Sequence, residues 1–171
     1  LNTTVTGVGN VALGSSAGCS LTSGQFNTFV GSGAGCANTT GLNNIALGSQ
    51  TLNAQVSGNC NIAIGNLAGI NLTTECGNVI VGPHPGVVGC NNNVYIADGT
   101  GTLRARVNEN GAIAIGGSGY GSSGQVLTSG GTTGSPTWTT VVSSGGTVTS
   151  ITPGTGLCAS SNPITTSGTL C

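Results

Sequence analysis

The chain repeats a short motif at a fixed interval. Asn-Val-Ala-Leu-Gly at residues 10–14 returns, with similar side chains, in evenly spaced copies that begin at Asn27, Asn44, Asn61 and Asn78. A sixth, imperfect copy begins at Asn93, slightly earlier than the same spacing would place it. Self-similarity at a fixed period is the signature of a repeat architecture. This repeat limits the possible folds more than any other feature of the sequence.

Each repeat predicts one short strand and one corner. The repeating unit is too short for a pair of helices, and each interior glycine costs a helix about 1 kcal/mol relative to alanine. An apolar run rich in β-branched residues and ended by glycine is typical of a strand that meets a turn. Strands stacked about 4.8 Å apart satisfy each other's backbone amides and carbonyls. We therefore predict an all-β fold, a parallel β-solenoid or β-roll with 17-residue coils over residues 1–92.

One asparagine opens each of the first five copies. The members of this column are Asn10, Asn27, Asn44, Asn61 and Asn78. Asparagine tolerates left-handed corner conformations and bonds to local backbone. Asparagines stacked at one position can also bond to each other as a ladder. We interpret the column as structural and not as a ligand site.

The predicted strands are apolar on both faces. Side chains alternate along a strand, so the first and third residues point one way and the middle residue points the other way. The middle column contains Ala12, Phe29, Ala46, Ala63 and Ile80. One face can line the roll and the other a neighbouring subunit, which makes the middle column the candidate subunit interface of a homo-oligomer. The alternative is a thicker monomeric roll with both faces inside.

Residues 93–116 and 117–171 differ from the repeats. In the first segment a Gly-rich turn after Asp98 predicts a β-hairpin, in which Leu103, Ala105 and Val107 alternate with two arginines. We interpret this segment as a cap that blocks further edge pairing. The second segment is uncharged and rich in Gly, Ser and Thr, with short apolar stretches. It predicts a small C-terminal β region that pairs with strands of other subunits and propagates a filament.

Composition and motifs argue against catalysis. Charged residues make up 3% of the chain, and the net charge of −1 gives no electrostatic reason to bind nucleic acid or an anionic membrane. No apolar run approaches the roughly 20 residues that span a bilayer. The one histidine, His84, lies in a Pro-His-Pro-Gly turn without a second histidine for a metal. We predict that the protein is not an enzyme and binds no cofactor or metal.

Seven cysteines favour an oxidising environment. Cys19 and Cys36 share one place in the repeat, which puts them in adjacent coils with Cα atoms about 5 Å apart, within disulfide range. Simple burial of the thiols is the alternative. Three sequons, at Asn2, Asn38 and Asn71, are candidate glycosylation sites. Disulfides and glycans both indicate an extracellular protein, at a cell surface or on a virion.

The repeat resembles the heads of trimeric autotransporter adhesins, which are left-handed parallel β-rolls. The stretch from Val94 to Arg104, and the motifs at residues 124–129 and 146–151, are similar to segments of bacteriophage and giant-virus tail-fibre proteins. This resemblance covers most of the chain and implies a fibre and a homotrimer. It does not identify a receptor.

Two functions fit these features best. The first is a structural subunit of an extracellular or virion-surface fibre or filament that assembles through β-strand and symmetric subunit contacts. The second is an adhesin or receptor-binding fibre that recognises a host surface glycan or protein. An ice-binding solenoid is disfavoured because the threonine column of Thr22, Thr39 and Thr73 is interrupted by Val56. An adhesin would be expected to present more aromatic side chains than the 3% found here.

Overall fold

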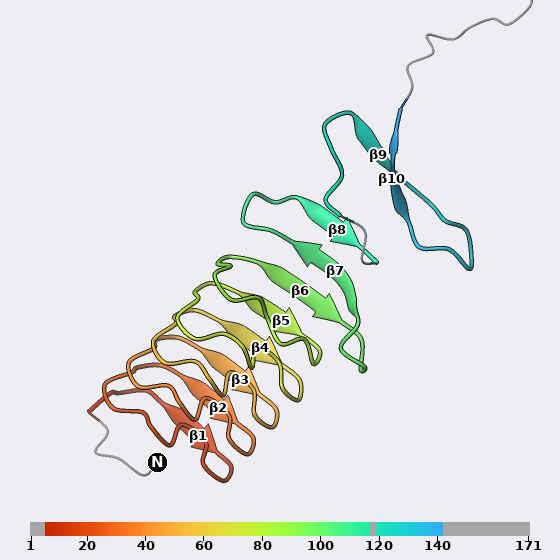
Figure 1. Cartoon of the computed structure of the whole chain (residues 1–171). Helices are drawn as coiled ribbons and strands as arrows, with labels where there is room; N and C mark the ends of the chain where they lie inside the picture. The colour runs from red at the N-terminus through yellow and green to blue at the C-terminus, as the bar shows by residue number, and fades with distance from the viewer. Residues whose placement is uncertain (1–5, 117–118, 142–171) are drawn as a thin grey trace, which may run out of the picture. The chain divides into compact units, whose positions relative to one another are not determined.

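The computed structural model describes residues 6–116 and 119–141 of the chain. The chain divides into two units, Leu1–Thr139 and Thr140–Cys171. Nearly all of the described residues belong to the first unit; only Thr140, at the end of the last strand, and Val141 belong to the second. The strands are shown in Figure 1.

The repeats form the predicted stack of short parallel strands. The strands are β1 (Val11–Leu13), β2 (Thr28–Val30), β3 (Ile45–Leu47), β4 (Ile62–Ile64), β5 (Val79–Val81) and β6 (Val94–Ala97). Each pairs in parallel with the next, and residues at the same place in the repeat are partners, as in Val11↔Thr28 and Ile45↔Ile62. The predicted fold class, an all-β parallel solenoid with coils of about 17 residues, is confirmed.

An antiparallel hairpin continues the same sheet. It consists of β7 (Leu103–Val107) and β8 (Ile113–Ile115), and β7 pairs with β6. The sheet therefore has eight strands in the order β1 to β8 and runs without a break across residue 93. A second, two-stranded sheet is formed by β9 (Gln125–Thr128) and β10 (Thr137–Thr140).

Glycine is required at the corner that follows each of the first four strands. At Gly48 the φ angle is +136°, a conformation that side chains rarely adopt. A Cβ atom there would lie 2.6 Å from the carbonyl oxygen of Gly65 in the next coil. The glycine that ends each motif thus permits both the turn and the close approach of successive coils.

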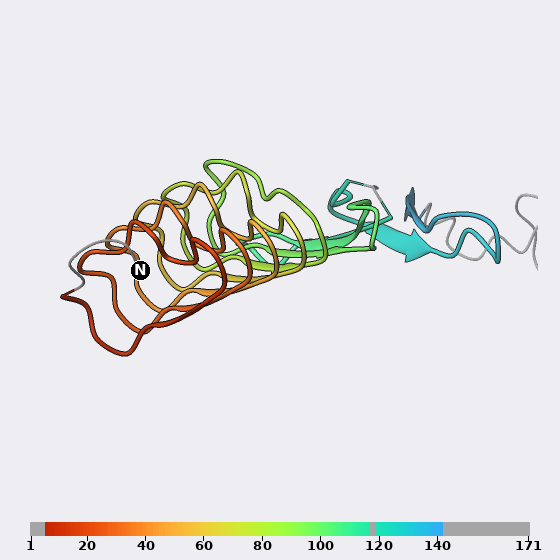
Figure 2. The same ribbon diagram turned by 90° about the horizontal axis from the view of Figure 1, so that it is seen from below.

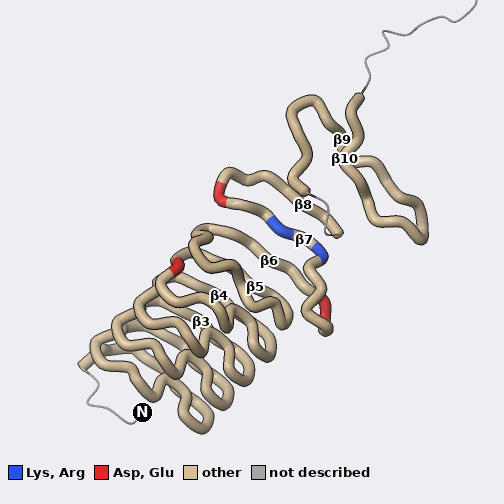
Figure 3. The backbone as a smooth tube through the Cα atoms, in the orientation of Figure 1, with Lys and Arg blue, Asp and Glu red and all other residues tan. Residues whose placement is uncertain are grey.

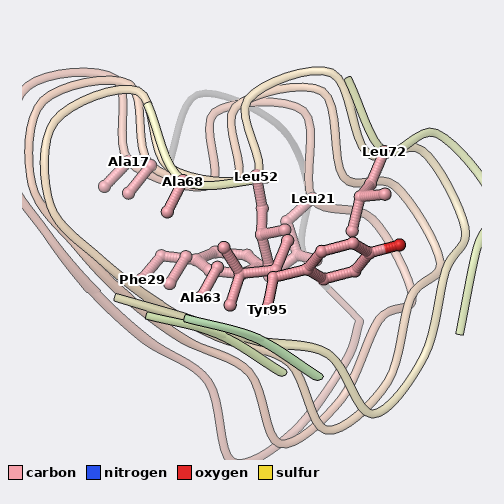
Figure 4. Packing of buried hydrophobic residues seen from close by; sticks show 11 residues of the cluster. Ala17, Leu21, Phe29, Leu52, Ala63, Ala68, Leu72 and Tyr95 are labelled. Atoms are coloured by element: carbon pink, nitrogen blue, oxygen red, sulfur yellow. The ribbon is translucent and has the colours of Figure 1, made fainter. Parts of the chain in front are cut away.

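The core lies inside the coils, between the sheet and the opposite wall. The wall contributes Ala17, Leu21, Ala34, Leu52, Ala68 and Leu72. The sheet contributes the middle residue of each strand, and Figure 4 shows Phe29, Ala63 and Tyr95 directed from the strands toward Leu52 and Leu72. In Figure 2 the sheet forms one side of the coils and the wall segments close the other side.

The middle column is therefore not the subunit interface that the sequence suggested. Phe29, Ala46, Ala63 and Ile80 are fully buried inside the coil, and Ala12 packs against the same core. The reason is that the rest of each coil folds back over this face of the strand. The alternation of side chains was predicted correctly, but the assignment of its two faces was reversed.

The hairpin also departs from strict alternation. A bulge at the Ile96/Ala97 step of the β6–β7 pairing places Leu103 opposite Ala97, and Leu103 packs against the core. Ala105 and Val107 pair with Ile96 and Val94 on the other face. The three apolar residues that the sequence placed on one face of β7 are thus divided between the two faces.

Candidate interaction surface

The first and third residues of the strands form one outward-directed surface, which we call the outer face. Because residues paired in register share a face, the hairpin extends this surface with its own apolar residues. The outer face consists of Val11, Leu13, Thr28, Val30, Ile45, Leu47, Ile62, Ile64, Val79, Val81, Val94, Ile96, Ala105, Val107, Ile113 and Ile115. All of these except Thr28 and Ala105 are Val, Leu or Ile.

The outer face is accessible over its whole length. Leu13 is 65% exposed at one end, Ile64 is 41% exposed in the middle and Ile113 is 47% exposed at the other end. None of its residues is charged. Figure 3 shows that the charged residues of the chain lie from Glu75 onward, beyond the first strands of the stack. Sheets that face water on one side usually alternate apolar and polar residues, and contiguous exposed apolar surface marks an interaction site.

The asparagine column holds the coils in register from inside. Asn44 donates from its backbone N and from Nδ2 to Oδ1 of Asn27, at 2.9 and 3.1 Å. Its Nδ2 also donates to the carbonyl of Gly58 in the next coil, at 2.8 Å. Asn27 and Asn61 bond in the same pattern. Asn10 begins the ladder, and Oδ1 of Asn78 accepts from the backbone N–H of Asn93, which continues it into the sixth copy. Asn27, Asn44, Asn61 and Asn78 are fully buried, so this ladder organises the coils and presents no ligand group to solvent.

The cysteines divide into one pair and three free thiols among the described residues. Cys19 and Cys36 form a disulfide with a Cα–Cα distance of 4.9 Å, which confirms the pairing predicted from their spacing. Cys60, Cys76 and Cys90 are free, and Cys60 is exposed. Cys158 and Cys171 lie outside the described residues.

The sequons are not equivalent. Asn38 is fully buried and its Nδ2 donates to Oε1 of Gln55 at 3.3 Å, so the folded chain cannot carry a glycan there. This corrects its selection as a glycosylation site, which rested on the motif alone. Asn71 lies in an exposed turn. Asn2 lies outside the described residues.

A cluster of polar and aromatic side chains closes the downstream end of the core. The rings of His84 and Tyr95 stack with centroids 4.8 Å apart, and the guanidinium of Arg106 lies 5.1 Å from the Tyr95 centroid. Arg106 also donates to Oδ1 of Asn93 at 3.0 Å. Burial raises the pKa of Tyr95 to about 12. Burial and the positive charge of Arg106 both lower the pKa of His84. The cluster is closed, and the described part of the chain contains no pocket.

The turn of the β6–β7 hairpin is fixed by Asp98. This carboxylate accepts hydrogen bonds from Thr100, and Arg104 donates to it from Nε at 2.8 Å. The bonds from Thr100 and Arg104 hold the pKa of Asp98 well below its usual value. Asp98, Arg104 and Arg106 therefore serve the hairpin and its packing on the last coil.

Glu75 is the residue whose role the sequence left unassigned. It interrupts a column of glycines, Gly7, Gly24, Gly41 and Gly58. The interruption lies in the fourth repeat, just before the fifth repeat, which is shorter than the others. Its side chain is buried and accepts backbone hydrogen bonds from Thr73, Thr74 and Gly89. Burial alone would raise the pKa of Glu75, but these hydrogen bonds outweigh it and the net shift is downward. The break in the glycine column was the sequence signal that could have identified Glu75 as a residue with a special role.

Other kinds of site are absent from residues 6–116 and 119–141. Within these ranges no three His, Cys, Asp or Glu side chains gather as metal ligands. The same residues include no helix of the length and apolarity needed to cross a membrane. Comparisons with models of protein families, with curated proteins and with solved structures find no match to this chain.

Proposed function

We propose that the protein is a structural subunit of an extracellular or virion-surface fibre, and that its subunits associate through the outer face. The observation that carries this proposal is the uncharged aliphatic surface that follows all eight strands of the sheet. Burial of such surface favours association by about 25 cal/mol for each Å² removed from water. The disulfide supports an oxidising location.

Three copies around an axis satisfy the geometry of this face. Residues 10–14 and their equivalents make one side of a coil about 16 Å wide, at roughly 3.3 Å per residue. Three such sides arranged as a triangle place each sheet about 5 Å from the axis, which is half of the roughly 10 Å between packed sheets. Side chains from three outer faces then fill the axis. We therefore propose a parallel homotrimer.

The test is an aspartate on the outer face and a matched aspartate beside it. Ile64→Asp places one carboxylate per subunit at the proposed axis, while Asn66→Asp adds the same charge two residues away in an exposed turn. Burying unpaired charges is costly. We expect the parent chain and Asn66→Asp to sediment as trimers and Ile64→Asp to sediment as a monomer with unchanged circular dichroism. A parent chain that is a monodisperse monomer at micromolar concentration contradicts the proposal.

A further inference from the structure

The fifth coil is closed by a segment unlike those of the other coils. Residues 83–92, which we call the strap, replace the longer wall segments because the fifth repeat is shorter than those before it. Gly69 donates its N–H to the carbonyl of His84 at 2.8 Å, and Asn71 donates to the carbonyl of Pro85 at 2.9 Å. Gly86 is buried, and a Cβ atom on it would lie 2.7 Å from Cδ2 of Leu72. The strap thus covers the downstream end of the core.

Two titratable side chains fix the strap: His84 accepts a hydrogen bond within its turn and stacks on Tyr95, and Glu75 of the preceding coil accepts a hydrogen bond from it. Nδ1 of His84 accepts from the N–H of Gly86 at 3.1 Å, which requires a neutral imidazole with its proton on Nε2. Oε1 of Glu75 accepts from the N–H of Gly89 at 2.8 Å. Oε2 of the same carboxylate accepts from the N–H of Thr73 at 2.6 Å. A proton on Nδ1 abolishes the first bond, and a proton on the carboxyl weakens the others.

The surroundings of both groups oppose a proton in the closed strap. His84 faces Tyr95 of β6, and beyond this ring lies Arg106 of β7, which also contacts Cys90 and Tyr120. Arg106 is the one charged group in this cluster at neutral pH, and its charge disfavours an imidazolium. Glu75 contacts backbone amides and the Thr73 hydroxyl, all of which donate to a carboxylate.

We propose that the strap is an acid-released latch: protonation of His84 and of Glu75 frees residues 83–92 and uncovers Leu72, Ile80 and Tyr95. This proposal does not depend on the fibre. Both groups have pKa values below their ordinary ones in the closed state, so the open strap binds more protons. Closure is therefore strongest above pH 6.5. It weakens as the pH falls below 6.5 for His84 and below 4.5 for Glu75.

The first test is an NMR titration of the His84 ring in the full chain. Because the chain contains one histidine, its ring signals need no assignment by mutagenesis. We expect a midpoint below 6.5, with loss of the chemical-shift perturbation caused by the Tyr95 ring as the strap opens. A midpoint at or above 6.5, or a ring that stays stacked on Tyr95 when protonated, overturns the proposal.

The second test is hydrogen exchange of the strap against that of the second and third coils. Protection factors for residues 83–92 should fall about tenfold for each pH unit in which one group takes up its proton, whereas those for residues 28–47 stay constant. In His84→Gln the step that begins as the pH falls below 6.5 should vanish. In Glu75→Gln that step should remain while the lower one disappears. Two results contradict the latch. One is a protection factor for the strap that changes with pH in the same way as that of residues 28–47. The other is a pH step in strap protection that stays the same in His84→Gln.

Discussion

Each asparagine of the ladder makes bonds both to its own column and to the backbone. Asn44 satisfies the N–H of Asn61 through Oδ1 and the carbonyl of Gly58 through Nδ2. Neither group has access to water, because Asn61 and Gly58 are both buried. At the scale of single residues, the ladder therefore carries hydrogen bonds that a substituted side chain cannot replace.

We expect Asn44→Ala to lower the free energy of unfolding by about 3 kcal/mol, because it leaves two buried backbone groups without partners. Asn66→Ala removes the same atoms from an exposed turn and should change stability by less than about 0.5 kcal/mol. Chemical denaturation of both variants measures the difference. Equal stabilities would show that the ladder contributes nothing.

At the scale of elements, the first coil differs from the others. Within the described residues, it packs against another coil on one side only. An internal coil is held by backbone hydrogen bonds on both sides. In the second coil, the N–H of Asn43 donates to Gln25 of the first coil, and the carbonyl of Leu42 accepts from Cys60 of the third. The disulfide between Cys19 and Cys36 joins this first coil to the second. It lies where stacking alone provides the fewest contacts, and ends of repeat arrays are the parts that open most readily.

Reduction of the disulfide should therefore free the first coil while the middle of the stack remains closed. Closing a loop of this length is worth about 3 kcal/mol, so exchange of residues 6–24 should accelerate by roughly a hundredfold. Residues 45–64 serve as the internal reference. Cys19→Ser should show the fast exchange without reductant and no further change with it. If residues 6–24 and 45–64 respond equally, the disulfide stabilises the stack as a whole instead.

For the molecule as a whole, the charges and the outer face are segregated. The charged residues gather around the strap and the hairpin, while the outer face has none (Figure 3). Association through this face therefore depends on apolar burial and not on ion pairs. Apolar burial is little affected by sodium chloride, whereas interactions between exposed charges are screened.

We expect the trimer dissociation constant to change by less than about threefold between about 50 and 500 mM sodium chloride. Sodium sulfate at equal ionic strength should strengthen association, because it favours burial of apolar surface. Sedimentation equilibrium measures both effects. A trimer that falls apart at high sodium chloride would show that charged residues outside the outer face hold it together.

The sequence by itself determined the period, the position of every repeat strand, the asparagine column and the Cys19–Cys36 pairing. These follow from spacing, because residues one period apart must stack when every coil has the same path. The break in the glycine column at Glu75 was visible in the sequence as well. The role of Glu75 was not, because its hydrogen-bond partner Gly89 lies in a segment that does not follow the repeat.

Only the tertiary structure decided which face of each strand lies inside. The two outer columns hold the larger aliphatic residues, while the middle column is mostly alanine, so hydrophobicity alone favoured the wrong side. Space inside the coil decides the matter. Leu52 and Leu72 reach across from the opposite wall and leave room for one side chain per strand, which is alanine in β1, β3 and β4. A strand pattern specifies alternation, but the closure of the rest of the coil selects the face that is buried.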